Sequence, residues 1–170
     1  MPSLDRYDEW LALVTEYGED QMAGSGFSGE HQPVLTPAGY TDWIAFLETE
    51  ADESLPAFEG RVKSSYFWIL DDTGRWVGFL ALRRTLNDFL RELGGHIGYS
   101  VRPSRRREGH ASTALRLALV EARALGLDRV LVTCDEDNLG SRRTIESSGG
   151  VYEDTRQGRR RYWLSPPPRR

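Results

Sequence analysis

The sequence predicts an α+β fold, with a mixed sheet and flanking helices, and three observations lead to this prediction. Two pairs of apolar and aromatic runs, within residues 65–82 and 151–164, each enclose a short turn and indicate antiparallel hairpins. Between them, a strand, a helix and a second strand follow in about forty residues, which indicates a right-handed unit with two parallel strands. Two amphipathic helices precede the first hairpin. At 170 residues the chain fits one domain, residues 1–170.

The N-terminal part is predicted to be helical. Apolar residues recur at helical spacing over residues 4–17, and Thr36 with Pro37 is a typical helix start, with Thr as the cap and Pro in the first position. The second helix ends in the acidic run at 50–53. Its predicted buried stripe consists of Tyr40, Trp43, Ile44 and Leu47. Residues 18–33 hold four glycines and little periodicity, so we expect a loop between the helices.

The first hairpin is predicted to pair residues 65–70 with 75–82 around the turn DDTG. A connector at 87–93 has no clear pattern. The second hairpin is predicted to pair residues 151–153 with 160–164 around Gln157 and Gly158, and the tail at 165–170 is expected to be frayed.

The central strand alternates Ile97, Tyr99 and Val101 with smaller or polar residues, and Pro103 ends it because proline has no amide hydrogen to donate. Three arginines and a glycine follow, and apolar residues then recur at helical spacing over 111–125. Gly126 ends this helix, the β-branched run at 129–134 is the second parallel strand, and Asn138 caps a short helix that ends before Gly149.

The start of the long helix is a predicted anion site. A helix start leaves backbone N–H groups unpaired and carries the positive end of the helix dipole. Gly109 lets the backbone approach a phosphate without a Cβ, and Ala111 keeps the first turn slim. Arg106 and Arg107 would add charge-assisted hydrogen bonds. A plain connection with solvated arginines is the alternative interpretation.

Two motifs in this region resemble those of the GNAT superfamily of N-acetyltransferases. Arg106, Gly109 and Ala111 form R-x-x-G-x-A, which is similar to the acyl-coenzyme A pyrophosphate loop of that family. The loop before this helix, residues 102–112, contains neither the G-K-[ST] of a mononucleotide loop nor the G-x-G-x-x-G of a dinucleotide fingerprint. About thirty residues on, a strand, N-x-x-S and a helix ending in glycine resemble the second family motif. Its residues here are Asn138, Ser141, Ile145 and Gly149.

The resemblance implies a GNAT-like single domain whose mostly antiparallel, twisted sheet holds a central pair of parallel strands that splay apart. It implies a helical acceptor-side region at 1–60, a sheet core with the acyl-coenzyme A site at 61–164, and a tail at 165–170. Acetyl-CoA is the implied co-substrate, with no metal. The implied cofactor-binding residues are Tyr99, Ser100, Val101, Arg106, Arg107, Glu108, Gly109, His110, Ala111, Ser112, Asn138 and Ser141.

The implied chemistry is direct attack of a neutral amine on the thioester in a ternary complex, with a backbone amide near Val101 polarising the carbonyl. His96 fills the position where family members often carry a glutamate base, and histidine titrates near neutral pH. Glu92 is the reserve candidate. A histidine packed on a strand and hydrogen-bonded to a neighbour is the alternative interpretation of His96.

The general acid departs from the family pattern. Many members place a tyrosine in the second-motif helix, and the matching residue here is Ile145, which has no proton to give. Tyr152, Cys134 or water is left to protonate the thiolate, and a free thiol titrates near 8.5, so an acid is not strictly required. Cys134 on its apolar strand is otherwise a core residue.

Charge is distributed unevenly along the chain. Residues 1–100 carry 7 basic and 17 acidic side chains, and residues 101–170 carry 15 basic and 9 acidic ones, which suits an anionic cofactor beside a cationic amine. An uneven but solvated surface is the alternative. Glu19, Asp20, Glu30 and His31 of the loop would attract that amine, unless they are ordinary solvated loop charges.

Composition excludes several classes of protein. One cysteine rules out an internal disulfide framework. The N-terminus has no basic stretch followed by an apolar core, and no apolar run reaches the length of a membrane span, so we expect a cytoplasmic protein without a membrane partner. A pI near 5.5 argues against nucleic acid as a partner.

The sequence therefore predicts an N-acetyltransferase that acts on the primary amine of a small molecule. Two alternatives stay open: a protein or peptide N-acetyltransferase, and a degenerate member that binds acyl-CoA without turnover. The acceptor, the acyl length and whether the chain forms a homodimer are also open.

Overall fold

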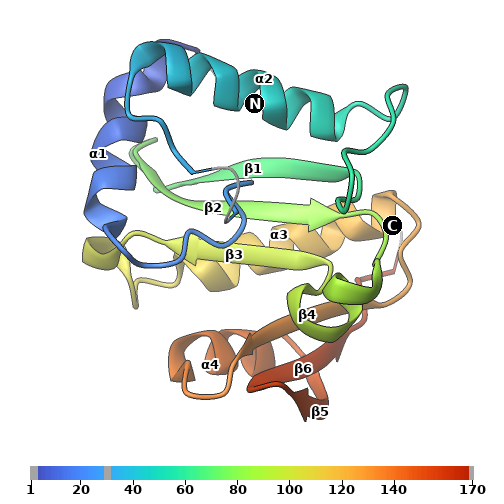
Figure 1. Cartoon of the computed structure of the whole chain (residues 1–170). Coiled ribbons are helices and arrows are strands. Elements are labelled where there is room, and N and C mark those ends of the chain that lie inside the picture. Colours follow the sequence, from blue (N-terminus) through green and yellow to red (C-terminus); the bar gives the residue numbers. More distant parts are fainter. Residues whose placement is uncertain (1–3, 29–31, 169–170) are drawn as a thin grey trace.

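The computed structural model describes residues 4–28 and 32–168. Within these ranges six strands form one sheet in the order β1-β2-β3-β4-β6-β5 (Figure 1). The strands are β1 Ser64–Leu70, β2 Trp76–Arg83, β3 Ile97–Val101, β4 Val130–Asp135, β5 Val151–Arg156 and β6 Arg159–Leu164. The α-helices are α1 Tyr7–Tyr17, α2 Pro37–Ala51, α3 His110–Ala124 and α4 Leu139–Ser147. The predicted α+β class with flanking helices is confirmed.

The sheet is antiparallel except at its centre, where β3 and β4 run parallel. Only one pair of residues is in register between these two strands, Ile97 with Val132. Every other neighbouring pair of strands is in register over at least five positions. The predicted central pair of splayed parallel strands is therefore confirmed.

The local signals explain most of the element boundaries. The Thr36 hydroxyl accepts a hydrogen bond from the N–H of Gly39 at 3.1 Å, as expected of an N-cap. In the first hairpin turn, the carboxylate of Asp71 accepts from the N–H groups of Thr73 and Arg75 at 2.9 and 3.0 Å. The predicted hairpins and the predicted loop over the described part of 18–33 are confirmed.

The structure differs from the prediction, or adds to it, in three places. Leu4–Arg6 form a 3-10 turn, so the first α-helix begins at Tyr7. The patternless connector contains a π-helical turn, Leu90–Gly94, closed by a 2.6 Å hydrogen bond from the Gly95 N–H to the Leu90 carbonyl. The tail is not frayed throughout, because Pro166 is buried.

Both faces of the sheet are covered, and each has its own core. Helices α1 and α2 pack on β2 and β1, over an aromatic cluster that includes Trp10, Trp43 and Trp76 (Figure 1). Helix α3 packs on β1, β2 and β3 from the other side, over aliphatic residues. Strand β2 lies between these two layers of helices, so side chains on both of its faces are buried.

Candidate functional site

A cavity of about 1610 Å³ opens where β3 and β4 part. Sites for one small ligand usually occupy 300–1,000 Å³, so this cavity has room for two. It reaches from the start of α3 to the end of α2. We call the part around residues 105–112 and the gap between β3 and β4 the α3 end. The part around residues 24–28, Glu50, Arg61, Tyr66 and Arg83 is the α2 end.

The α3 end has a helix start without a side-chain cap among the described residues. The N-cap is Gly109, and the first hydrogen bond within the helix runs from the Thr113 N–H to the Gly109 carbonyl at 3.0 Å. The N–H groups of His110, Ala111 and Ser112 precede that bond, and all three residues line the cavity. The predicted anion site therefore has its donors available.

Gly109 has a second reason to be glycine, beyond the close approach to a phosphate. Its φ is +87°, a conformation that residues with a side chain rarely adopt. A Cβ built on Gly109 would meet no atom within 4 Å, because it would project into the open cavity. Any side chain here would enter open space beside the start of α3.

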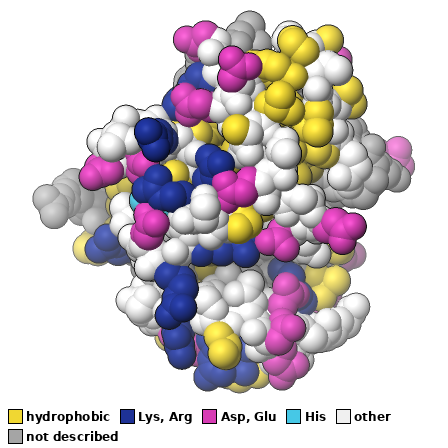
Figure 2. Space-filling view, turned by 90° about the vertical axis from the view of Figure 1, so that its left-hand side faces the viewer, with side chains coloured by type: hydrophobic (Ala, Val, Ile, Leu, Met, Phe, Trp, Pro, Cys, Tyr) yellow, Lys and Arg dark blue, Asp and Glu magenta, His cyan; other side chains and the backbone are white. Residues whose placement is uncertain are grey.

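The loop that precedes α3 is held by acids from two other elements. Glu16 of α1 accepts from Arg102 Nε at 2.6 Å and from the Ser104 N–H at 2.7 Å. Asp71 of the first hairpin turn accepts from Arg105 at 2.7 Å. On this face of the molecule, basic and acidic side chains lie next to one another (Figure 2). The loop is therefore fixed in place before any ligand arrives.

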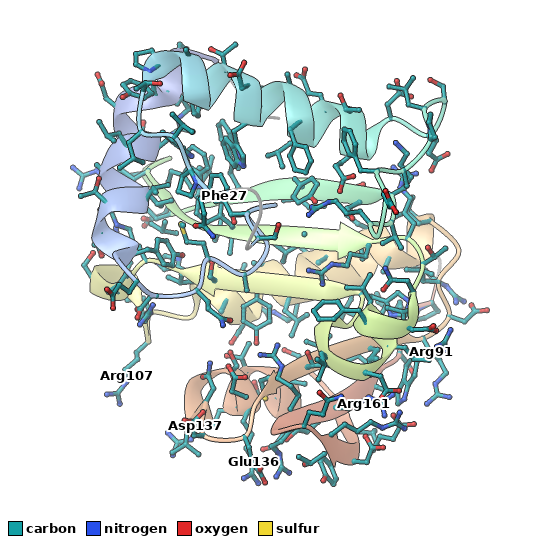
Figure 3. All side chains as sticks on the ribbon, in the orientation of Figure 1. Phe27, Arg91, Arg107, Glu136, Asp137 and Arg161 are labelled. Atoms are coloured by element: carbon teal, nitrogen blue, oxygen red, sulfur yellow. The ribbon has the colours of Figure 1, made fainter. Side chains whose placement is uncertain are left out.

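Arg106 and Arg107, the two arginines predicted to bind the phosphates, differ in their contacts. Arg106 donates to the Val101 carbonyl at 3.0 Å and to Asp20 at 2.8 Å, so its guanidinium is already engaged. Arg107 has a φ of +67° and extends outward from the loop (Figure 3). Glu108 turns toward Arg105 and does not line the cavity. Backbone N–H groups therefore dominate this end.

Strand β3 turns alternate peptide groups toward its two neighbours. Just outside the two ends of β3, the Arg83 N–H donates to the His96 carbonyl, and the Arg102 N–H donates to the Val77 carbonyl. The even-numbered positions of this segment therefore pair with β2. The peptide groups of the odd-numbered residues Tyr99 and Val101 therefore point toward the gap.

Ser100, Asn138 and Ser141 line the cavity in other ways. By the same alternation the peptide of Ser100 pairs with β2, and its hydroxyl accepts from Tyr17 at 3.1 Å. Asn138 caps α4, with its side-chain oxygen accepting from the Ser141 N–H at 2.9 Å. All twelve predicted cofactor residues except Glu108 line the cavity, and their contact with coenzyme A stays a prediction.

The two predicted bases lie elsewhere. His96 is buried, and its Nδ1 accepts a hydrogen bond from the Leu131 N–H at 2.9 Å. Burial, together with the charges of Arg83 and Arg91, lowers the pKa of His96 to about 4. Glu92 forms an ion pair with Arg156 at 2.5 Å. Neither side chain lines the cavity, which argues against both as the base and favours the packed histidine.

The residues considered for the general acid do not have a favourable position for that role either. Ile145 is fully buried in the aliphatic core, and Tyr152 is exposed and bonded to Thr155. Cys134 lines the cavity, but it is a core residue whose pKa is raised by burial. Tyr99, predicted as a cofactor-binding residue and not as an acid, donates from its hydroxyl to the Ser141 carbonyl at 3.5 Å. Burial raises the pKa of Tyr99 to about 12, so the phenol stays protonated at neutral pH.

The α2 end contains charged residues that the sequence analysis did not single out. Glu50 has no exposed surface, and its Oε2 accepts from Arg61 at 2.8 Å and from the Tyr66 hydroxyl at 3.3 Å. Arg83 donates to the carbonyls at positions 94 and 95, both at 3.0 Å. Glu50 follows Leu47 by three residues, so its place on the buried stripe was a usable signal.

The acidic residues predicted to attract the amine do not gather at the α2 end. Glu19 and Asp20 line the cavity, but Asp20 is paired with Arg106. Glu30 and His31 lie outside the described residues. In the part of the chain that the structure describes, no cluster of potential metal ligands is present, and no helix is long and apolar enough to cross a bilayer.

Comparison with known proteins relates this chain to one family. The family model of the acetyltransferase (GNAT) domain matches residues 8–151. None of the curated proteins searched matches the sequence.

Three solved structures are similar in fold. RimJ of Mycobacterium smegmatis, in complex with CoA-disulfide, has a TM-score of 0.69 at 20% identity, covering 96% of this chain and 79% of its own. Ribosomal-protein-S5-alanine acetyltransferase of Vibrio fischeri has 0.67 at 14%, covering 98% and 91%. A spermidine N-acetyltransferase chimera from Vibrio cholerae and hSSAT has 0.61 at 14%, covering 96% and 93%.

Proposed function

The chain belongs to the GNAT family of acetyltransferases, and we propose that it transfers an acetyl group from acetyl-CoA to the primary amine of a small molecule. The observation that supports this most strongly is the α3 end of the cavity. There, three unpaired N–H groups of α3 meet the gap between β3 and β4, so one continuous space can take a diphosphate and an extended arm.

The residues at the α3 end fit coenzyme A. The N–H groups of His110, Ala111 and Ser112 would hold the diphosphate, and the peptide groups of Tyr99 and Val101 would line the arm. When bound, acetyl-CoA supplies the activated acyl group as a thioester. The Val101 N–H faces the gap and is the candidate donor to a developing oxyanion.

Proton transfer depends on water and on the substrates themselves in this proposal. With His96 and Glu92 off the cavity, no predicted base faces the reacting groups. Tyr99 remains a neutral hydrogen-bond donor next to the gap, but a phenol with a pKa of about 12 does not protonate a thiolate efficiently. Positioning of the two substrates then supplies most of the acceleration.

A small acceptor is supported by the way the loop over residues 18–28 covers the α2 end. A Cβ built on Gly24 would lie 2.4 Å from the Gly98 carbonyl and 2.9 Å from the Ala81 nitrogen, so the loop backbone lies directly on β2 and β3. An extended peptide would need an open groove at this place. The solved relatives are named for both a protein acceptor and a polyamine, and the covering loop is what favours the small acceptor in this proposal.

The test is thiol release from acetyl-CoA against a panel of small amines and short peptides, together with calorimetric titration of coenzyme A. We expect coenzyme A to bind and a small amine to be acetylated at its nitrogen. Acetylation of peptides alone would replace the small-molecule proposal with the protein alternative. Binding without turnover on any amine would favour the alternative of a degenerate member that only binds acyl-CoA.

A further inference from the structure

Arg83 is a charged residue at the α2 end that forms no ion pair with any carboxylate of the described residues. It is the last residue of β2, is half-buried and lines the cavity. Its Nη1 donates to the carbonyls of Gly94 and Gly95, both at 3.0 Å. Among the described residues, Arg83 has no carboxylate partner and no other side-chain hydrogen bond.

The other half-buried arginines of the same cavity are all paired with an acid. Arg61 is 2.8 Å from Glu50, and Arg159 is 2.6 Å from Asp135. Arg105 is likewise held by an acid of the first hairpin turn. Arg83 is therefore the exception. The three other half-buried arginines of the same cavity have similar burial, and each has an acid partner.

The contacts of Arg83 with the protein do not require a positive charge. A neutral amide could donate to the two carbonyls, whereas a guanidinium that leaves water without a counter-ion raises the free energy of the folded state. Burial lowers the pKa of Arg83, the nearby Tyr66 opposes this shift, and the positive charges of Arg61 and Arg159 add to it. A counter-ion supplied by a ligand would remove this cost.

Space for such a ligand is present beside the guanidinium. A Cβ built on Gly98 of β3 would lie 3.3 Å from Arg83 Nη2, so the glycine lets the guanidinium lie over the strand. Arg83, Gly98 and Ala81 all line the cavity, on the side where the loop over residues 24–28 covers β2 and β3. The guanidinium thus lies over β3 beside Gly98, at the α2 end of the cavity.

We propose that Arg83 binds a carboxylate of the acceptor, so that the substrate is an amine that also carries a carboxylate, as in an amino acid. This inference rests on the proposed function, because it assigns the α2 end to the acceptor. The fork of a guanidinium matches two carboxylate oxygens, and such charge-assisted pairs are the strong ones. An uncharged or polycationic amine would leave Arg83 without a counter-ion.

The first experiment compares matched acceptors with the wild-type protein. Common amino acids, β-alanine and γ-aminobutyrate are each measured as the free acid and as the carboxamide, with spermidine as a polycation. We expect kcat/KM for the best acid to exceed that of its carboxamide by about tenfold to a hundredfold. Equal rates for acid and amide, or a preference for the polycation, would overturn the inference and leave the proposed function standing.

Two variants then assign the preference to this side chain. Arg83→Gln should lose the preference for the acid, with KM for acetyl-CoA unchanged, and Arg83→Lys should keep part of it. Arg116→Gln, at an exposed position on α3, is the matched control and should keep all of it. A preference that survives in a folded Arg83→Gln protein would overturn the inference.

A measurement without turnover keeps the inference separate from the proposed function. The Nε–H signal of Arg83 is identified by its loss in Arg83→Lys and followed by NMR while glycine or glycinamide is added to the coenzyme A complex. A saturable shift with glycine alone would support the inference even if no amine is acetylated. The same response to both compounds, or none to either, would overturn it.

Discussion

The two ends of the cavity are built from different parts of the chain. At the α3 end, the groups offered to a ligand are backbone N–H groups of one strand–loop–helix segment, and the nearby arginines are mostly engaged with protein acids. At the α2 end, the groups are side chains of Glu50, Arg61 and Arg83, which come from three separate segments. Under the proposed function, the backbone groups serve the co-substrate acetyl-CoA, and the side chains serve the amine acceptor.

The largest expected effect is at the α3 end. Gly109→Glu should weaken coenzyme A binding a thousandfold or more, because it brings bulk and a negative charge to the open space beside the free N–H groups. Calorimetric titration measures this directly. An unchanged affinity would mean that the start of α3 is not the diphosphate site.

The control for this variant lies at the other end of the same helix. Gly126 has a φ of +84°, close to the +87° of Gly109, and a Cβ there would also meet no atom within 4 Å. Gly126→Glu therefore carries a similar backbone strain without reaching the cavity. We expect both variants to lose comparable thermal stability and only Gly109→Glu to lose coenzyme A.

The second prediction concerns the α2 end, where we expect a substitution to lower stability and to leave coenzyme A affinity nearly unchanged. Glu50→Ala should lower the free energy of unfolding by about 3 kcal/mol, since it leaves Arg61 and the Tyr66 hydroxyl without their buried acceptor. Coenzyme A affinity of the folded variant should stay within about twofold of wild type. Urea denaturation and calorimetry test the two halves of this statement.

Glu48→Ala is the matched control, because Glu48 is an exposed glutamate on the same helix. It should change stability by less than about 0.5 kcal/mol. If Glu50→Ala lost coenzyme A affinity as strongly as Gly109→Glu, the distinction between a backbone end and a side-chain end would be wrong.

The same distinction explains what could be predicted from the sequence. The α3 end is local: the strand, the glycine with positive φ and the helix are adjacent in the chain, so their pattern is visible in Tyr99 to Ser112. The α2 end joins residues from α2, the linker before β1 and the end of β2, and no spacing in the sequence brings these together. Only Glu50 could have been noticed in the sequence, because it is a carboxylate at a position on the buried stripe of α2.

The sequence left two roles open for the side chain of His96, a base and a packed histidine, and it could not choose between them for a related reason. The family resemblance implied a base at His96, but this residue lies just before β3 and follows Gly95, whose φ is +65°. The N–H and the Nδ1 of His96 both pair with the backbone of Leu131. The residue therefore braces β3 against β4 at the point where they are still joined. Its orientation depends on this long-range contact.

The third prediction uses this difference in role. Because the pKa of His96 is about 4 in the folded state and about 6.5 in an unfolded chain, the unfolded state binds the proton more tightly. The stabilisation from His96 is thus fully present above pH 6.5 and is lost as the pH falls toward 4. Between pH 8 and pH 4.5, wild type should lose about 2.5 kcal/mol more than His96→Asn, by urea denaturation.

Asparagine keeps an acceptor for the Leu131 N–H and removes the titration, so activity provides the second half of the test. The pH profile of kcat/KM for His96→Asn should follow that of wild type between pH 6 and pH 9. A variant that lost one limb of the profile would return His96 to the role of base.

The smallest expected effect is at the boundary of the two ends, where Asp20 of the loop pairs with Arg106. Asp20→Asn frees one side of that guanidinium, and we expect coenzyme A to bind about two- to threefold more tightly at low salt, since exposed ion pairs contribute little. Glu19→Gln removes the same charge from the adjacent residue and should have less effect. Arg106 stays bonded to the Val101 carbonyl in both variants, so a gain much larger than threefold would mean that side-chain charge rather than the backbone governs the α3 end.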